Sequence, residues 1–221
     1  RDSLSSLGDN VVYVGKWPWG SSGEYKWWKF FNRPEPTFQE FKMLRQKMTL
    51  AESVAFMFEG SRTVKKDNDV LENVSIKGIT YDFSKIYNLN IEKGRFFNEN
   101  EIVSGKNHII IGHNIYETIF NNINPIGKEI KISGVNSEII GVIEKEGESI
   151  TGTTQDNSVL APYLFAKRFL KERGSDPIIM VSAKNGVTNE ELKNEIRQMI
   201  RTIRRIRPLD EDNFALNETS I

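Results

Sequence analysis

The chain has 221 residues, of which 38% are hydrophobic and 27% are charged, a composition typical of folded globular proteins and not of disordered ones. Its 30 basic residues are balanced by 30 acidic ones, so no overall positive field favours binding to nucleic acid or to an anionic membrane. The absence of cysteine excludes disulfide bonds, thiolate catalysis and cysteine-based zinc sites. No apolar run approaches the length of about 18 residues that spans a bilayer, and no signal peptide is visible.

The N-terminal part of the sequence predicts strands around one well-marked helix. Thr37 and Glu40 form a capping box, in which the threonine hydroxyl and the glutamate carboxylate each accept a hydrogen bond from a free backbone N–H. A helix is therefore predicted to run from Thr37 to about Met48. Strands are predicted at residues 10–15, 52–60 and 70–81, and a short helix at residues 83–89.

The middle of the sequence is predicted to be rich in strands. Alternating apolar residues over 128–133 and 137–143, on either side of Gly134, indicate a β-hairpin. Residues 144–158 form a long polar loop, which makes them a weaker candidate for a contact region. Helices are predicted at residues 113–121 and 163–173.

The C-terminal part again predicts a strand, a helix and a strand. Thr188 and Glu191 form a second capping box, and the helix that follows carries apolar residues along one face only. Strands are predicted at residues 177–183 and 212–217, on either side of this helix.

The order of these elements indicates an α+β fold with two subdomains. Both flanks of the chain carry the strand–helix–strand pattern, whereas the middle has a different, β-rich rhythm. We therefore predict one α/β subdomain built from residues 1–88 and 177–221, with a β-rich subdomain of residues 89–176 inserted between them.

Motifs of several enzyme classes are missing. Gly127-Lys128 is followed by Glu129 where a phosphate-binding loop needs Ser or Thr, and there is no Gly-x-Ser-x-Gly elbow and no His-Glu-x-x-His helix. A predicted strand end and helix start separate the only histidines, His108 and His113, so we expect no shared site. We expect no catalytic, cofactor-binding or metal-binding residues, although an enzyme that pairs carboxylates in space stays open.

The loop between the first strand and the first helix contains all four tryptophans. Aromatic side chains offer a large contact area at a low entropic cost, so this loop is a candidate surface for a partner, glycan or lipid. The alternative is that the rings pack against the first helix, which we expect for at least two of the four. Trp27 and Trp28 are adjacent and are expected to differ in environment, with one of them exposed. The candidate contact residues are Trp17, Trp19, Tyr25, Trp27 and Trp28.

Basic residues gather at the end of the last predicted helix. One interpretation is contact with phospholipid headgroups. The preferred interpretation is that these cations complement the C-terminal helix dipole and are partly neutralised by the acidic residues that follow. The cluster consists of Arg201, Arg204, Arg205 and Arg207, followed by Asp210, Glu211 and Asp212.

An ordered series of segments resembles the extracytoplasmic core domain of MacB-like (FtsX-like) ABC transporter permeases. The series includes Gly94-Arg95-Phe96-Phe97, Asn107-His108-Ile109-Ile110-Ile111-Gly112, Pro125-Ile126-Gly127-Lys128, Glu138-Ile139-Ile140-Gly141 and Leu160-Ala161-Pro162. The resemblance is strongest over residues 70–163. An acidic segment containing Phe214 is similar to the one that such permeases carry just before their second membrane helix, and residues 4–14 are similar to the stretch after the first.

This resemblance implies a periplasmic domain that lies between two membrane helices of a bacterial inner-membrane protein. The flanks would form a porter-like subdomain and the insert a subdomain often called Sabre. The implied partners are a cognate ATP-binding subunit or domain, a second permease copy, and a periplasmic adaptor or a lipoprotein. The domain would recognise substrate or partner and relay ATP-driven motion, with no cofactor of its own. Because the chain begins at Arg1, without an initiator Met, we expect an internal segment of a longer protein.

Two other function classes stay open on the sequence alone. The main alternative is a stand-alone secreted binding module that uses the tryptophan-rich loop for glycan or protein contact. The second is an enzyme with unrecognised carboxylates, which predicts a concave pocket with converging acidic groups.

Overall fold

The computed structural model describes residues 10–20, 26–147 and 154–219. The strands are β1 (Val11–Gly15), β2 (Ala51–Lys66), β3 (Asp69–Ile79), β4 (Ile91–Gly94), β5 (His108–Ile111), β6 (Glu129–Ile132), β7 (Val135–Ile143), β8 (Ser158–Pro162), β9 (Ile178–Ala183) and β10 (Ala215–Asn217). The helices are α1 (Phe38–Lys47), α2 (Phe83–Tyr87), α3 (Glu99–Ser104), α4 (His113–Phe120), α5 (Tyr163–Ala166) and α6 (Asn189–Ile203), with a 3₁₀ turn η1 (Trp27–Lys29).

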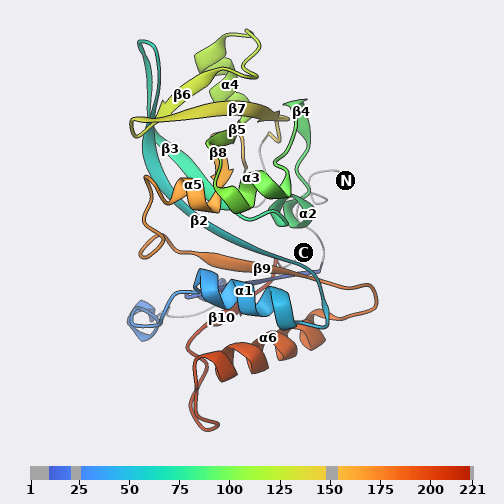
Figure 1. The fold of residues 1–221 in the computed structure, drawn as a ribbon. Coiled ribbons are helices and arrows are strands. Elements are labelled where there is room, and N and C mark those ends of the chain that lie inside the picture. Colours follow the sequence, from blue (N-terminus) through green and yellow to red (C-terminus); the bar gives the residue numbers. More distant parts are fainter. Residues whose placement is uncertain (1–9, 21–25, 148–153, 220–221) are drawn as a thin grey trace.

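The two flanks of the chain meet in one antiparallel sheet with the strand order β10-β1-β9-β2. Helices α1 and α6 lie together along one face of it (Figure 1). Successive side chains of a strand point to opposite faces. Accordingly, Val12 and Val14 of β1 pack in the same core as Leu44 of α1 and Ile196 of α6, while Tyr13 packs in a second core with α2.

The β-rich part contains a closed ring of six strands. The order around the ring is β2-β3-β8-β5-β7-β6, and β6 pairs again with β2 through Val64 and Ile132. Strand β4 is added outside the ring, along β7. Because the ring is closed, each of its strands is paired on both sides. Aliphatic residues at the centres of these strands pack into one core, which favours closure. The fold is therefore a mixed α+β fold with a six-stranded, barrel-like sheet.

Strand β2 belongs to both parts of the molecule. Its 16 residues pair with β9 near the start and with β3 and β6 further on. Met57 is the residue where the two pairings meet, because it lies opposite Ile178 on one side and Ile79 on the other. One continuous strand thus runs from the flank sheet into the ring (Figure 1). The predicted subdomain boundaries at 88/89 and 176/177 stay a prediction, since β2 and β3 contribute to the ring as well.

Most predicted elements are present, with bounds shifted by a few residues. Both capping boxes are confirmed, since Thr37 accepts a hydrogen bond from the N–H of Glu40, and Thr188 accepts one from that of Glu191. The hairpin of β6 and β7 is confirmed around Gly134. Strand β2 is longer than predicted, because it continues to Lys66 and pairs with the ring beyond its first half.

Two predicted bounds in the middle of the chain are wrong, and one helix there is missing from the prediction. The helix expected to reach residue 173 ends at Ala166. Beyond it, the carbonyl of Phe169 accepts a hydrogen bond from the side chain of Arg62 at 2.8 Å instead of one from a following turn of helix. The polar loop ends earlier than expected, because residue 158 already belongs to β8. Helix α3 was not predicted, although Asn98 and Glu101 form a third capping box. Within the described residues no helix is both long and apolar enough to cross a membrane.

Candidate partner-contact surface

The tryptophan-rich loop is anchored at its base by the last strand. The amide of Asn217 donates to the carbonyl of Trp17 at 2.9 Å and accepts from the N–H of Trp19 at 2.9 Å. The indole N–H of Trp17 also donates to Asp176, at 3.3 Å. These contacts come from residues some 160 to 200 positions away in the chain, so the base of the loop is fixed by the tertiary fold.

The first two tryptophans lie against the body of the domain. Trp17 is half-buried, and the ring of Trp19 lies 4.9 Å from that of Tyr13 on β1. Burial raises the pKa of Tyr13 to about 12. Trp17 and Trp19 thus pack on β1 and the segment around Asp176, not on the first helix as predicted.

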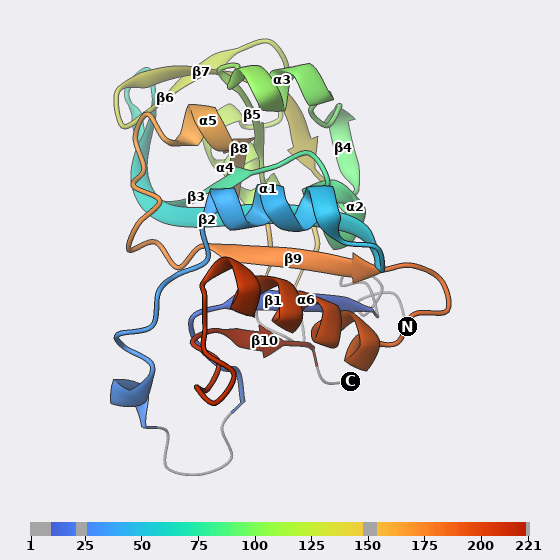
Figure 2. The same cartoon turned by 60° about the horizontal axis from the view of Figure 1, so that its bottom comes forward.

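The second pair of tryptophans forms an exposed aromatic cluster with Phe31. Trp27 is 54% exposed, Trp28 57% and Phe31 58%. The ring of Trp27 contacts the rings of Trp28 and Phe31 edge to face, with centroids 6.2 Å and 5.9 Å apart. The expectation that the two adjacent tryptophans differ in environment is therefore wrong, since both are exposed. Adjacent side chains diverge in a 3₁₀ turn, and η1 stands off from the body, so both reach solvent (Figures 1 and 2). Tyr25 lies outside the described residues.

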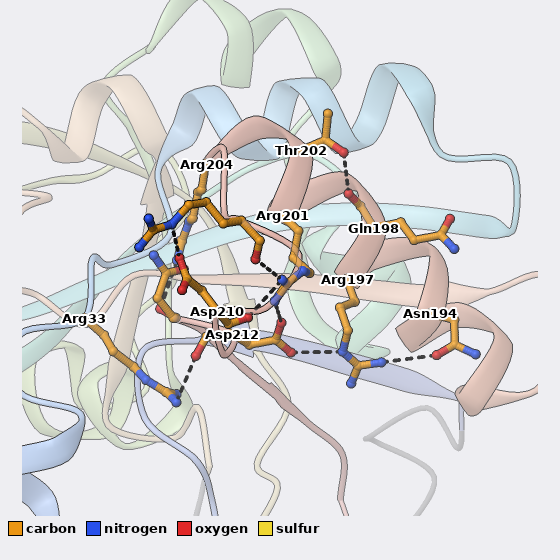
Figure 3. A network of polar contacts seen from close by, with 11 residues as sticks. Arg33, Asn194, Arg197, Gln198, Arg201, Thr202, Arg204, Asp210 and Asp212 are labelled. Atoms are coloured by element: carbon orange, nitrogen blue, oxygen red, sulfur yellow. Dashed lines mark hydrogen bonds and ion pairs between the residues drawn. The ribbon is translucent and has the colours of Figure 1, made fainter.

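Arg197, Arg201 and Arg204, near the end of α6, make polar contacts within the domain (Figure 3). Arg197 and Arg201 both bind the carboxylate of Asp212, at 3.0 Å and 2.7 Å. Arg201 also donates to the carbonyls of Arg207 and Asp210. The predicted neutralisation by acidic residues beyond the helix is thus confirmed for Asp212, and also for Asp210, which accepts from Arg207 at 2.8 Å.

Arg204 pairs with a carboxylate that sequence proximity does not suggest. Its guanidinium binds Glu40 of α1 at 2.7 Å and 3.1 Å. The same side chain donates to Asn213, at 2.9 Å. The network of α6 therefore fixes both α1 and the loop that leads to β10.

Two long-range contacts connect the tryptophan-rich loop to its neighbours. The side chain of Arg33 donates to the carbonyl of Asp212 at 3.2 Å (Figure 3). On the other side, the carboxylate of Glu35 accepts the backbone N–H of Gly174 at 3.1 Å. The loop, the segment at 170–176 and the loop at 204–214 therefore lie together at one end of the flank sheet, which we call the aromatic end (Figure 2).

The two histidines each lie between two carboxylates, in separate places. His113 contacts Glu92 at 2.7 Å and Glu117 at 2.9 Å, through its two ring nitrogens. Burial opposes protonation of His113, but these hydrogen bonds outweigh it and raise the pKa. His108 lies between Glu101 and Glu138. Within the described residues, no group of three potential ligands could hold a metal ion.

Two carboxylates, those of Asp156 and Glu146, hold the two ends of the polar loop together. Asp156 accepts the backbone N–H groups of Glu146 and Gly147, at 2.9 Å and 3.1 Å. Glu146 in turn accepts the N–H of Gln155 at 3.0 Å, and burial raises its pKa. The contacts close the neck of the loop, whose residues 148–153 lie outside the described part.

A depression of about 380 Å³ lies where the turn between β2 and β3 meets β6. Its charged lining consists of Lys65, Lys66, Lys131, Asp67 and Glu129. The enzyme alternative predicts a pocket lined by converging acidic groups. This depression has three lysines and two acidic residues in its lining, so it does not fit that prediction.

The sequence matches a known family over most of its length. The profile of the MacB-like periplasmic core domain matches residues 1–199. The chain is 26% identical over 222 residues to the macrolide export ATP-binding/permease protein MacB of Chlorobium luteolum, covering 99% of this chain and 32% of that protein. It is 27% identical over 125 residues to the pyoverdine export ATP-binding/permease protein PvdT of Pseudomonas aeruginosa, covering 56% of this chain and 19% of that protein. The chain thus spans a third or less of the curated relatives it matches.

Solved structures share the fold at low sequence identity. The periplasmic region of MacB from Actinobacillus actinomycetemcomitans superposes with a TM-score of 0.76 at 16% identity, over 98% of this chain and 92% of that one. The extracellular domain of the transporter YknZ from Gram-positive bacteria gives 0.70 at 17% identity, over 95% of this chain and 100% of that one. The chain therefore belongs to the MacB-like periplasmic core domain family, and it is an extracytoplasmic segment of a bacterial inner-membrane ABC permease.

Proposed function

We propose that this domain recognises a substrate or partner outside the cytoplasm and relays to it the ATP-driven motion of membrane helices. The relatives named above are export proteins that combine an ATP-binding part with a permease. For this chain, the energy would come from a cognate ATP-binding subunit or domain, acting through the membrane part of a permease dimer. The domain itself would carry no chemistry, and a periplasmic adaptor or lipoprotein is the proposed kind of partner.

The observation that carries this proposal is the continuity of β2 between the flank sheet and the ring. A strand that is hydrogen-bonded to neighbours on both sides is held along both edges, so we propose that a rotation of the flank sheet is passed on to the ring. Met57, with partners on β9 and β3, lies at the junction. We propose that the porter-like part (1–88 and 177–221) and the inserted part (89–176) move together for this reason.

The positions of the chain ends support a lever-like arrangement. Asn10 and Thr219, the first and last described residues, adjoin the same end of the paired strands β1 and β10. The aromatic end adjoins their other end, at Gly15 and Ala215. A displacement that enters through the chain ends is therefore delivered across the sheet to Trp17, Trp19, Trp27 and Trp28, the described members of the proposed contact set.

The proposed function is tested by measuring both export and ATP hydrolysis by the parent transporter in the same variants. The variant is Trp27→Ser with Trp28→Ser, and the control is Leu164→Ser, which removes an exposed apolar side chain from α5. We expect export to fall in the tryptophan variant while ATP hydrolysis continues, because recognition is lost and the motor is intact. The proposal fails if export is normal in this variant and also after deletion of the whole domain.

The alternative of a stand-alone secreted binding module has less support. Family membership favours the permease, and the aromatic rings of Trp27 and Trp28 meet at 84°, whereas sugar rings stack on one flat face. The alternative predicts glycan binding that is lost after Trp→Ala substitution at positions 17–28, and an array of bacterial and host glycans measures it.

A further inference from the structure

We propose that the aromatic end of the domain is a docking surface for an acidic face of another extracytoplasmic protein. This inference rests on the proposed function and names the chemistry of the partner. Three features support it: rigid aromatic anchors, a preorganised exposed leucine, and exposed basic side chains without an ion pair to any described residue.

The aromatic anchors are Trp27, Trp28 and Phe31. Their turn is closed by hydrogen bonds from the N–H groups of Phe30 and Phe31 to the carbonyl of Trp27, both at 3.1 Å. The ammonium of Lys16 lies 5.2 Å from the centre of the Phe31 ring. Large aromatic side chains that are held before binding lose little entropy on contact, which is the property of interface hot spots.

Leu209 is the second anchor, and it is 98% exposed. It follows Pro208 in a tight turn that the N–H of Asp210 closes onto the carbonyl of Arg207 at 2.9 Å. Arg201 of α6 donates to the carbonyls of both Arg207 and Asp210, so hydrogen bonds to the helix fix the conformation of the turn. A large apolar side chain on a braced turn suits insertion into a partner's apolar pocket.

Basic residues outnumber acidic ones at the aromatic end. The tryptophan-rich loop, the segment at 170–176 and the loop at 204–214 contain nine basic residues and seven acidic ones. Among the acidic ones, Asp210 and Asp212 bind arginines. In contrast, the exposed basic side chains Lys26, Lys29 and Arg205 have no ion pair with any described residue.

This local excess of positive charge occurs in a chain whose net charge is zero. Complementary potentials across an interface speed encounter and exclude wrong partners, so the partner that fits is acidic around an apolar centre. The surface is therefore aromatic and aliphatic at its anchors and basic around them.

The position of the surface favours a protein over a lipid bilayer. The first and last described residues adjoin the end of β1 and β10 opposite to it. If the chain continues into membrane helices there, the aromatic end points away from the bilayer, towards other extracytoplasmic proteins.

Fluorescence anisotropy of a labelled peptide tests the proposal on the 221-residue chain. The probe is a fluorescein-labelled peptide of glutamates with interspersed leucines, and its comparison is the same peptide with lysine for glutamate. We expect binding of the acidic peptide only, with affinity that decreases as salt is added. Lys26→Glu with Lys29→Glu is expected to weaken binding about tenfold or more, as is Leu209→Ser with Trp28→Ser.

The matched control is Lys128→Glu with Lys131→Glu, which makes the same charge change on exposed residues at the ring. It is expected to bind as the unchanged chain does. The proposal is overturned if the acidic peptide does not bind, if both double lysine variants lower affinity equally, or if anionic phosphatidylglycerol vesicles bind instead through Trp28 and Leu209. Because the assay contains no membrane part, such a result leaves the relay of motion untouched, and export by the parent transporter tests that separately.

Discussion

Arg204 of the last helix and Glu40 of the first form a two-pronged ion pair across 164 positions of the chain. Both side chains are more than nine-tenths buried. The same carboxylate also accepts the N–H of Thr37 at 2.9 Å and so completes the capping box of α1. One carboxylate therefore sets where α1 begins and holds α6 beside it.

We predict that Glu40→Gln destabilises the domain by roughly 3–5 kcal/mol, because the arginine is left nearly buried without its counter-charge. Glutamine keeps the capping interaction, so the loss reports the ion pair. Urea unfolding measures it. The control is Glu99→Gln, whose partner Arg45 is half exposed, and its expected cost is only about 0–1 kcal/mol. Equal shifts in the two variants would contradict this account.

Gly112 has no room for a side chain. A Cβ there would lie 2.2 Å and 2.3 Å from the carbonyl oxygens of Gln155 and Asp156. We predict that Gly112→Ala lowers the unfolding free energy by about 1–3 kcal/mol, since backbone must move. Gly15→Ala is the control, because the nearest side-chain atom is 3.7 Å away, on Ile178. Thermal unfolding of the two variants measures this difference in stability. Similar unfolding midpoints would show that the close approach of Gly112 to the two carbonyl oxygens does not limit stability.

The stability of the domain is predicted to depend on the protonation of His113. Its folded-state pKa is raised by Glu92 and Glu117, so protons bind the folded state more tightly. The stabilisation is therefore fully present below the unfolded-state pKa of about 6.5 and is lost as the pH rises through the folded-state pKa. We expect the stability difference between the unchanged chain and His113→Gln to shrink over that window. Urea titrations at several pH values measure this difference, and one that does not change with pH would refute the prediction.

Asp156 is predicted to hold the neck of the polar loop closed. Asp156→Ala removes the acceptors of two backbone N–H groups, those of Glu146 and Gly147. Faster hydrogen exchange at these two amides is expected, by about tenfold for each 1.4 kcal/mol of local stability lost. Asn157→Ala is the control, since this exposed side chain accepts, among the described residues, from Asn114 alone. If exchange at the two amides stays at its original rate in Asp156→Ala, the carboxylate does not close the neck.

Local signals in the sequence predicted local structure well. The capping boxes at Thr37 and Thr188 gave helix starts that the structure confirms, because their partners lie within one turn. The box at Asn98 and Glu101 carries the same signal with asparagine, and it marks the start of α3, which the predicted elements lack. The resemblance to MacB-like permeases led to the correct family, which periodicity and composition alone do not reveal.

Long-range features were beyond prediction from patterns. Nothing local to Arg204 points to Glu40, and nothing in β6 shows that Ile132 closes a ring with Val64. The exposure of both Trp27 and Trp28 depends on how η1 lies relative to the body, and the long-range contacts nearest to it are those of Arg33 with Asp212 and of Glu35 with Gly174. The candidate contact residues therefore stay a prediction, and the placement of the described ones at one end comes from the tertiary structure.

The central claim, that the domain moves as one body with the transporter, is tested most directly by pulsed electron paramagnetic resonance distances in the parent permease. The chain has no cysteine of its own, so exposed positions such as Lys128 of the ring and Gln198 of α6 accept spin labels cleanly. Between the ADP and ATP states, we predict an unchanged distance from 128 to 198 within one copy and a changed distance between the 128 positions of two copies. A distance within one copy that changes, or two copies that keep their separation, would contradict the account.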